Sequence, residues 1–150
     1  MTGKADFTPE QWELVLEGPP SAAMIVITAG RGGTLRETLS MAKTYAEARQ
    51  LHGQSELLDE IVGAKPEIDH TRHRSFEELK RNGLAHLRDA VGLLEDKATP
   101  QELDDYKRFV VALAENVAKA HREGGRDEAA ISAGEQAAIA EIEHALGASA

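Results

Sequence analysis

Cysteine is absent from this chain of 150 residues. The sequence therefore excludes a disulfide, a zinc site built on thiolates and a cysteine nucleophile. A chain without disulfides is also what we expect of a cytoplasmic protein, because the cytoplasm keeps thiols reduced.

Long hydrophobic runs are missing as well. No apolar stretch approaches the roughly 20 residues that span a bilayer, and the first residues, Met1 to Asp6, carry no apolar signal core. Basic residues are scarce relative to acidic ones: 17 Lys and Arg stand against 26 Asp and Glu, which gives a formal net charge of -9. Such a chain lacks the clustered cations that bind nucleic acid or an anionic membrane surface, so we expect neither partner.

The length of the chain suits a single domain, since a chain of this size buries roughly two-thirds of its unfolded surface on folding. Alanine, leucine, glutamate and arginine dominate the longer segments, and all four are good helix formers. We expect a flexible N-terminus over residues 1–7, a helical domain over residues 8–147 and a frayed tail over residues 148–150.

The most informative stretch runs from Thr99 to Gly147. Thr99 is placed to cap a helix, Pro100 to take its first position and Glu102 to complete a capping box. An apolar stripe with spacings of three and four follows: Leu103, Tyr106, Phe109, Val110, Leu113, Ala114, Val117, Ala118 and His121. After Gly124-Gly125, a second capping box begins another striped helix: Ser132, Glu135, Ala138, Ile139, Ile142 and Leu146. Neither helix can bury its stripe alone, so we expect the two to pack as an antiparallel pair.

Similar signals predict five more helices upstream. Capping boxes begin at Thr8, Thr34 and Ser75. The predicted helices cover residues 8–18, 22–29, 34–52, 55–62 and 75–96. The first two are separate because Pro19-Pro20 breaks the chain, and Ser21 then caps the second. In the third, a small-residue face suits close helix contact: Leu35, Leu39, Ala42 and Ala46.

The segment Met24-Ile25-Val26-Ile27-Thr28 is apolar and β-branched, as a buried strand would be. A short apolar run cannot be assigned from periodicity alone. The rest of the chain offers no second strand, and a lone strand would leave its backbone groups unpaired. We therefore interpret this segment as a short buried helix, with the strand as the alternative.

The order of features also repeats. Ala22 to Lys43 runs from an apolar segment through a glycine loop to a capped helix, and Ala114 to Glu143 follows the same order. Together these signals predict an all-α fold: a single compact bundle of about seven helices with a pseudo-twofold repeat.

Several of these segments resemble small bacterial all-helical proteins of the tellurite-resistance protein B (TerB)-like type. The resemblance lies in Val117–His121, Gly124-Gly125 and Ile131–Ile142, in the earlier Ala22–Met41, and in the helix entry Thr99–Val110. It implies a compact helical bundle with pseudo-twofold repeats, no established enzymatic activity, roles in stress response and protein assembly, and acidic metal-binding loops.

The metal loops of that family carry an Asp-Gly pair, and this chain departs from it. Ala29-Gly30-Arg31 in the first copy has no acidic residue, and Arg122-Glu123-Gly124 in the second offers Glu123 instead. In the following loop, Asp127 and Glu128 are candidate oxygen ligands for a divalent metal, although their spacing matches no defined calcium loop.

A second candidate metal loop holds the densest histidine cluster, Asp69-His70-Thr71-Arg72-His73. His70 and His73 are three residues apart and could share a transition metal, but no further ligand is identifiable. For both loops, solvated polar side chains are the interpretation that the sequence favours. A divalent metal is the one cofactor that these patterns raise.

Two other patterns point to binding or catalysis. Ile25 to Thr34 could be a strand, a glycine loop and a helix start that cradles phosphate with Arg31. It lacks both the Walker pattern and the dinucleotide fingerprint, so a plain helix–loop–helix junction is the favoured interpretation. No nucleophile elbow or Ser-His-Asp spacing is recognisable, although catalytic triads assemble from distant residues. We expect no enzymatic activity, with an enzyme as a third alternative.

The expected function is that of a non-catalytic cytoplasmic interaction or scaffold protein, related to stress response, that binds a protein partner or associates with itself as a homodimer. An apolar groove or a small-residue helix face would serve as the contact surface. Trp12 and Phe109 are the aromatic candidates for a partner contact, although both positions also fit core anchors. The alternative is a helical domain that binds a metal or a small ligand.

Overall fold

A computed structural model of the chain describes residues 4–29, 34–50, 56–63, 76–124 and 133–147. Every structural statement below refers to these ranges. They contain one short 3-10 helix and six α-helices: η1 (Lys4–Asp6), α1 (Pro9–Ala29), α2 (Thr34–Gln50), α3 (Glu56–Gly63), α4 (Phe76–Lys97), α5 (Pro100–Gly124) and α6 (Ala133–Leu146). The predicted all-α class is confirmed.

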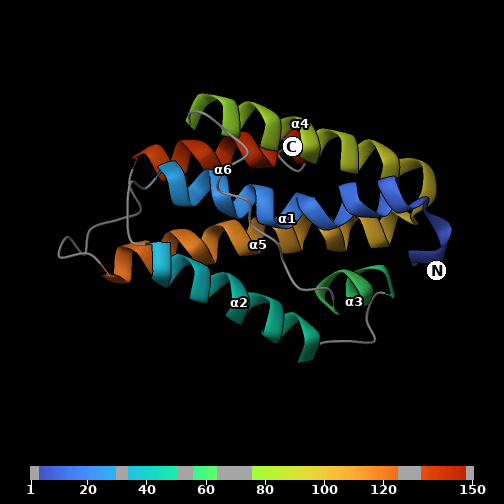
Figure 1. Cartoon of the computed structure of the whole chain (residues 1–150), viewed down its shortest axis with the longest axis horizontal. Helices are drawn as coiled ribbons and strands as arrows, with labels where there is room; N and C mark the ends of the chain where they lie inside the picture. Colours follow the sequence, from blue (N-terminus) through green and yellow to red (C-terminus); the bar gives the residue numbers. More distant parts are fainter. Residues whose placement is uncertain (1–3, 30–33, 51–55, 64–75, 125–132, 148–150) are drawn as a thin grey trace.

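Helices α1 and α5 lie side by side at the centre of the bundle, with α4 and α6 on one side and α2 and α3 on the other (Figure 1). Helix α6 runs antiparallel to α5, as expected, and it also packs against α1 and α4. Helix α2 packs mainly on α5. The helix that follows α1 packs on α5, and the helix that follows α5 packs on both α4 and α1. The pseudo-twofold symmetry itself stays a prediction.

Reciprocal capping boxes begin two of the helices. At the start of α5, the Thr99 hydroxyl accepts a hydrogen bond from the Glu102 N–H (3.1 Å) and the Thr99 N–H donates to the Glu102 carboxylate (3.1 Å). Thr8 and Gln11 make the same pair of bonds at the start of α1. These bonds satisfy N–H groups that have no partner within the helix, so they fix where each helix begins.

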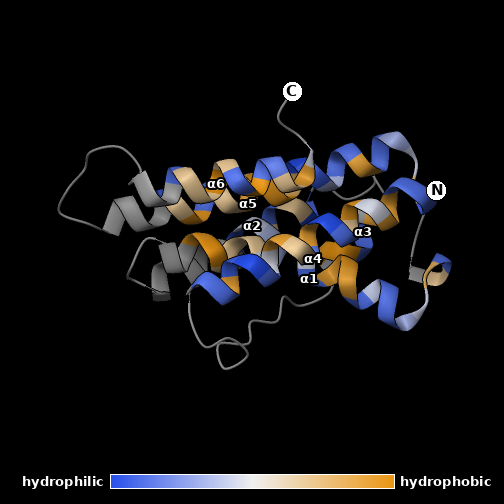
Figure 2. Cartoon of the chain, turned by 90° about the horizontal axis from the view of Figure 1, so that it is seen from above, coloured by the Kyte–Doolittle hydropathy of each residue, from blue (hydrophilic) through white to orange (hydrophobic). Residues whose placement is uncertain are grey.

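The core is formed by the inward faces of all six helices, and each helix carries both hydrophobic and hydrophilic residues (Figure 2). The predicted stripe of α5 is buried at Tyr106, Phe109, Val110, Leu113, Ala114, Val117 and Ala118. The stripe of α6 is buried at Ala138, Ile142 and Leu146, with Ile139 partly buried. Periodicity alone identified these faces because a helix buries the residues that recur every three to four positions.

The predicted break at Pro19-Pro20 is wrong. Both prolines lie inside the continuous helix α1, so the bundle has six described helices where seven were expected, and Ser21 lies within α1 and caps nothing. Pro19 has no N–H to donate to the carbonyl of Val15 four residues earlier. The Tyr106 hydroxyl of α5 donates to that carbonyl instead, at 2.8 Å. The helix thus continues because another helix supplies the missing donor.

Gly18 makes room for this contact. A Cβ atom at Gly18 would collide with the Tyr106 hydroxyl, and it would lie 3.2 Å from the Tyr106 Cζ. Residues 24–28 continue the same helix, with Ile25 and Val26 fully buried. The interpretation of this segment as helix is therefore confirmed, although it is the second half of a longer helix.

The expected alanines do not form the face of α2 that packs in the bundle, and the side chains of Leu35 and Leu39, the other members of the expected face, lie outside the described part of the chain. Ala42 and Ala46 are exposed, whereas Thr44 and Tyr45 are buried. The Tyr45 ring packs edge-on against Phe109 of α5, with 5.1 Å between ring centroids. The large aromatic buries more apolar area than the alanines could, and it sets which face of α2 meets α5.

The N-terminal segment contacts the end of α4. Phe7 is buried against Trp12, with 5.5 Å between ring centroids. The Lys97 ammonium donates to the Asp6 carbonyl (2.9 Å) and lies 5.7 Å from the centre of the Phe7 ring.

The predicted domain boundaries themselves stay a prediction. Among the described helices, none combines the length and hydropathy that crossing a membrane requires.

Candidate functional site: a charged groove along α5

The predicted metal ligands lie outside the described residues. This holds for His70 and His73 in one loop and for Asp127 and Glu128 in the other. Within the part of the chain that the structure describes, no group of three or more His, Asp or Glu side chains is arranged to hold a metal ion. The glycine loop of the phosphate-cradle alternative, residues 30–33, is likewise not described.

The two aromatic candidates lie in the core. Trp12 is 7% exposed and Phe109 is 6% exposed. Trp12 packs against Phe7, and Phe109 packs against Tyr45. These contacts match the alternative that the side chains anchor the core, and a role for either in binding a partner stays a prediction.

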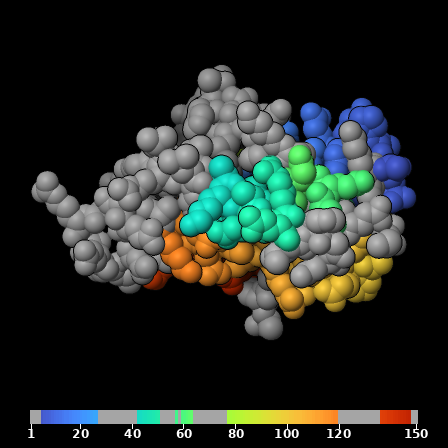
Figure 3. Space-filling view, turned by 90° about the horizontal axis from the view of Figure 1, so that it is seen from below, coloured from blue at the N-terminus to red at the C-terminus, as the bar shows by residue number. Residues whose placement is uncertain are grey.

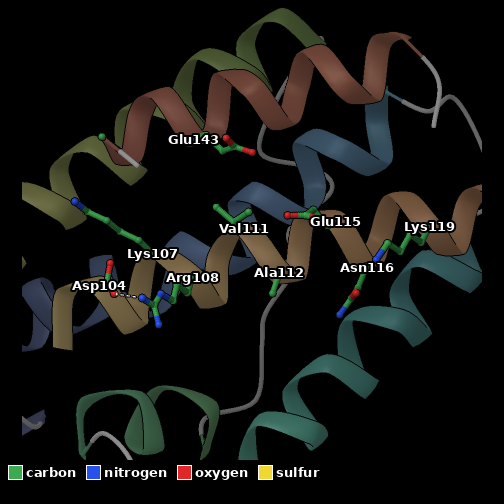
Figure 4. Close-up of a pocket in the computed structure, with 10 residues that line it drawn as sticks. Asp104, Lys107, Arg108, Val111, Ala112, Glu115, Asn116, Lys119 and Glu143 are labelled. Carbon is green, nitrogen blue, oxygen red and sulfur yellow. Dashed lines mark ion pairs between the residues drawn. The ribbon is translucent and has the colours of Figure 1, made fainter. Parts of the chain in front are cut away.

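A groove of about 700 Å³ runs along the outer face of α5. It is lined by Asp104, Lys107, Arg108, Val111, Ala112, Glu115, Asn116 and Lys119 of α5, and by Glu143 and Gly147 at the end of α6. Figure 4 shows Val111 and Glu115 on the α6 side of α5, Ala112 and Asn116 on the α2 side, and Glu143 pointing from α6 toward α5. In the space-filling view, α5 reaches the surface beside α2 (Figure 3).

Local contacts hold α5 and the end of α6 in place beside the groove. On the α2 side, the Asn116 side-chain amide donates to the Thr44 hydroxyl at 3.0 Å and ties α5 to α2. On the α6 side, Gly147 adopts a positive φ of 70°, and its N–H donates to the His144 carbonyl at 3.0 Å. This left-handed glycine ends α6 beside the groove, as glycines commonly end helices.

Charges of both signs line the groove around a small apolar floor. Asp104 and Arg108 form an ion pair at 2.9 Å, with side chains 50% and 74% exposed. Four further charged side chains make no ion pair or hydrogen bond with any other residue that the structure describes: Lys107, Glu115, Lys119 and Glu143. Between the charged residues, Val111 is partly buried and Ala112 is exposed. The groove therefore presents charges of both signs around an apolar centre of Val111 and Ala112.

The resolved pKa shifts lie elsewhere, in the core. Burial raises the pKa of Tyr45 and of Tyr106 above its ordinary value. Both hydroxyls consequently stay protonated over the physiological range, and that of Tyr106 is bound to a backbone carbonyl. Their role is structural.

The groove could not be predicted from the apolar stripe of α5, because that stripe identifies only the buried face of the helix. The sequence nevertheless contains a pattern that marks the groove face of α5. Asp104, Arg108, Ala112, Glu115 and Lys119 also recur at spacings of three and four, on the face that remains when the apolar stripe is removed.

No family model matches the chain, and no curated protein or solved structure matches it either. The resemblance to TerB-like proteins is therefore untested and stays an expectation.

Proposed function

We propose that this chain is a non-catalytic helical interaction protein of the cytoplasm, and that it docks another polypeptide on the outer face of α5. The observation that carries the proposal is the groove itself, in which four charged side chains without a partner among the described residues surround Val111 and Ala112. A helix face with a small apolar centre and a charged rim has the anatomy of a protein contact surface.

The composition of the groove favours a polypeptide over a small molecule. Small-molecule sites are mostly apolar and enclose most of the ligand surface. This groove is partly open, and seven of its ten lining residues are charged or amide side chains. A partner helix can lie along such a groove and pair with the charges on both rims.

The rigid attachment of α5 supports the same role. Helix α5 contacts all five of the other described α-helices, and the capping box at Thr99 fixes its start. A contact surface on a helix that is held from several sides needs little ordering when a partner binds, which lowers the entropic cost of association.

Photo-crosslinking in the native cell tests this proposal. Glu143 on the groove rim is replaced by a photo-reactive phenylalanine analogue, and Glu95, exposed on α4, is replaced in a control variant. We expect a discrete crosslinked polypeptide from position 143 that position 95 does not give, identified by mass spectrometry. No crosslinked polypeptide at position 143, or equal yields at both positions, would overturn the proposal.

A further inference from the structure

The groove face of α5 carries its charges in a regular order. From the N-terminal end, Asp104 is negative, Arg108 is positive, Val111 and Ala112 are apolar, Glu115 is negative and Lys119 is positive. Asp104, Arg108, Ala112 and Lys119 are exposed, and Val111 and Glu115 are partly buried. At 1.5 Å per residue this stripe is about 23 Å long.

This order is complementary to itself when it is reversed. In an antiparallel pair of α5 helices centred between Val111 and Ala112, Asp104 lies opposite Lys119 and Arg108 lies opposite Glu115. Each of these pairs occurs twice in a symmetric dimer, so four oppositely charged pairs surround an apolar centre. We propose that the partner of this face is the same face of a second copy of this chain, with the two α5 helices antiparallel across the contact. This inference rests on the proposed function and names its partner.

The charge order also selects the orientation. In a parallel arrangement in register, each charge would face its own copy, which places like charges opposite one another at four positions. Like charges in an interface cost free energy, whereas complementary charges fix the register.

The size of the surface sets the expected strength. A stripe one helix wide and about 23 Å long, with the rims at Lys107 and Glu143, falls short of the roughly 800 Å² per partner of a standard stable interface. The net charge of -9 on each copy adds repulsion outside the contact. We therefore expect a reversible dimer that forms in the micromolar range and dissociates on dilution.

Charge reversal combined with mixing tests the proposal by sedimentation velocity. Arg108→Glu and Glu115→Arg each place like charges opposite one another twice, and each should raise the dimer dissociation constant by about tenfold or more. An equimolar mixture of the two variants should dimerise again, because Glu at 108 of one chain then faces Arg at 115 of the other. Arg88→Glu and Glu95→Arg on α4 are the controls with the same changes of charge, and they should leave the dimer intact. Circular dichroism checks that every variant is folded.

Three outcomes would overturn the inference: a wild-type chain that stays monomeric up to millimolar concentration, reversals that leave a dimer unchanged, or a mixture that does not recover. These failures are distinguishable from failure of the proposed function. If the crosslinker at position 143 captures a discrete polypeptide other than this chain, the docking function stands and only the second copy as its partner is excluded.

Discussion

The Tyr106 hydroxyl donates a hydrogen bond to the carbonyl of Val15 at 2.8 Å, and this carbonyl is the one that Pro19 leaves without a helical donor. Tyr106 is fully buried, so the bond forms away from water. The contact joins the two central helices and replaces the donor that α1 loses at Pro19. This part of the hydrogen bonding of α1 is therefore a tertiary property of the bundle.

Removal of the Tyr106 hydroxyl should lower the stability of the fold, because the Val15 carbonyl of α1 then loses its hydrogen-bond donor. Tyr106→Phe leaves the Val15 carbonyl buried and without a donor, which should lower the free energy of unfolding by about 1–3 kcal/mol. Tyr45→Phe is the matched control, because the Tyr45 hydroxyl makes no hydrogen bond with the described residues. Urea unfolding of the three proteins measures the difference. Equal stability of the two variants would contradict the role of the hydroxyl.

Gly18 and Tyr106 should be energetically coupled. Gly18→Ala drives a methyl group into the Tyr106 hydroxyl, and we expect a loss of about 1–3 kcal/mol from this overpacking. In the double variant with Tyr106→Phe the colliding oxygen is absent, and the nearest ring atom lies at a tight but tolerable 3.2 Å. The two losses should therefore sum to more than the loss in the double variant. A double-mutant cycle by urea unfolding measures this, and strict additivity would show that the two sites act independently.

Two glycines inside α4 should respond in opposite directions to the same substitution. A Cβ at Gly83 would lie 2.8 Å from Ile25 Cδ1, and Ile25 is fully buried, so Gly83→Ala should destabilise the contact between α4 and α1. A Cβ at Gly92 meets nothing within 4 Å, so Gly92→Ala should stabilise the helix by about 0.5–1 kcal/mol. Thermal unfolding of both variants measures the shifts. A loss of stability in Gly92→Ala would mean that this face of α4 is not open.

The buried tyrosines should make the fold sensitive to alkali. Burial raises the pKa of Tyr45 and Tyr106 in the folded chain above the value of about 10 in the unfolded chain. The folded state then holds more protons above pH 10, so the stability that these groups contribute is complete below pH 10 and is lost as the pH rises toward their folded pKa. Each tyrosine can contribute a slope of at most about 1.4 kcal/mol per pH unit.

Urea unfolding between pH 9 and pH 11 measures this slope. Lysine side chains titrate in the same range, so the comparison is with the double variant Tyr45→Phe/Tyr106→Phe, which keeps every lysine. We expect a shallower decline of stability with pH in the double variant. The same slope in both proteins would show that the tyrosines do not carry the effect.

Much of the fold could be predicted from local sequence because local chemistry fixes it. The capping boxes at Thr8 and Thr99 are within four residues of the groups that they bond, and the stripes of α5 and α6 follow helical periodicity. The passage of α1 through Pro19 could not be predicted in this way. It depends on a donor 91 residues away from the carbonyl that accepts it, which no local pattern specifies.

The groove, too, could not be predicted from local sequence alone. Its charges are visible in the sequence of α5, but only the packing of α2 and α6 beside that helix shows that they line a groove. Ala42 and Ala46 of α2 do not make the contact with α5, although small residues suit close packing in general, because Tyr45 decides the contact in this bundle. The candidate ligands His70, His73, Asp127 and Glu128 lie outside the described residues, so metal binding in either loop stays a prediction.

The central claim, that the outer face of α5 is where this chain meets another chain, can be measured with a single spin label. The chain contains no cysteine, so Lys107→Cys on the groove rim provides the only thiol, and Arg88→Cys on α4 provides a control. At concentrations where the chain self-associates, we expect strong dipolar coupling between labels at position 107, none between labels at position 88, and loss of the coupling when Arg108→Glu is added. Uncoupled labels at position 107 in a dimeric sample, or coupling at position 88 instead, would contradict the account.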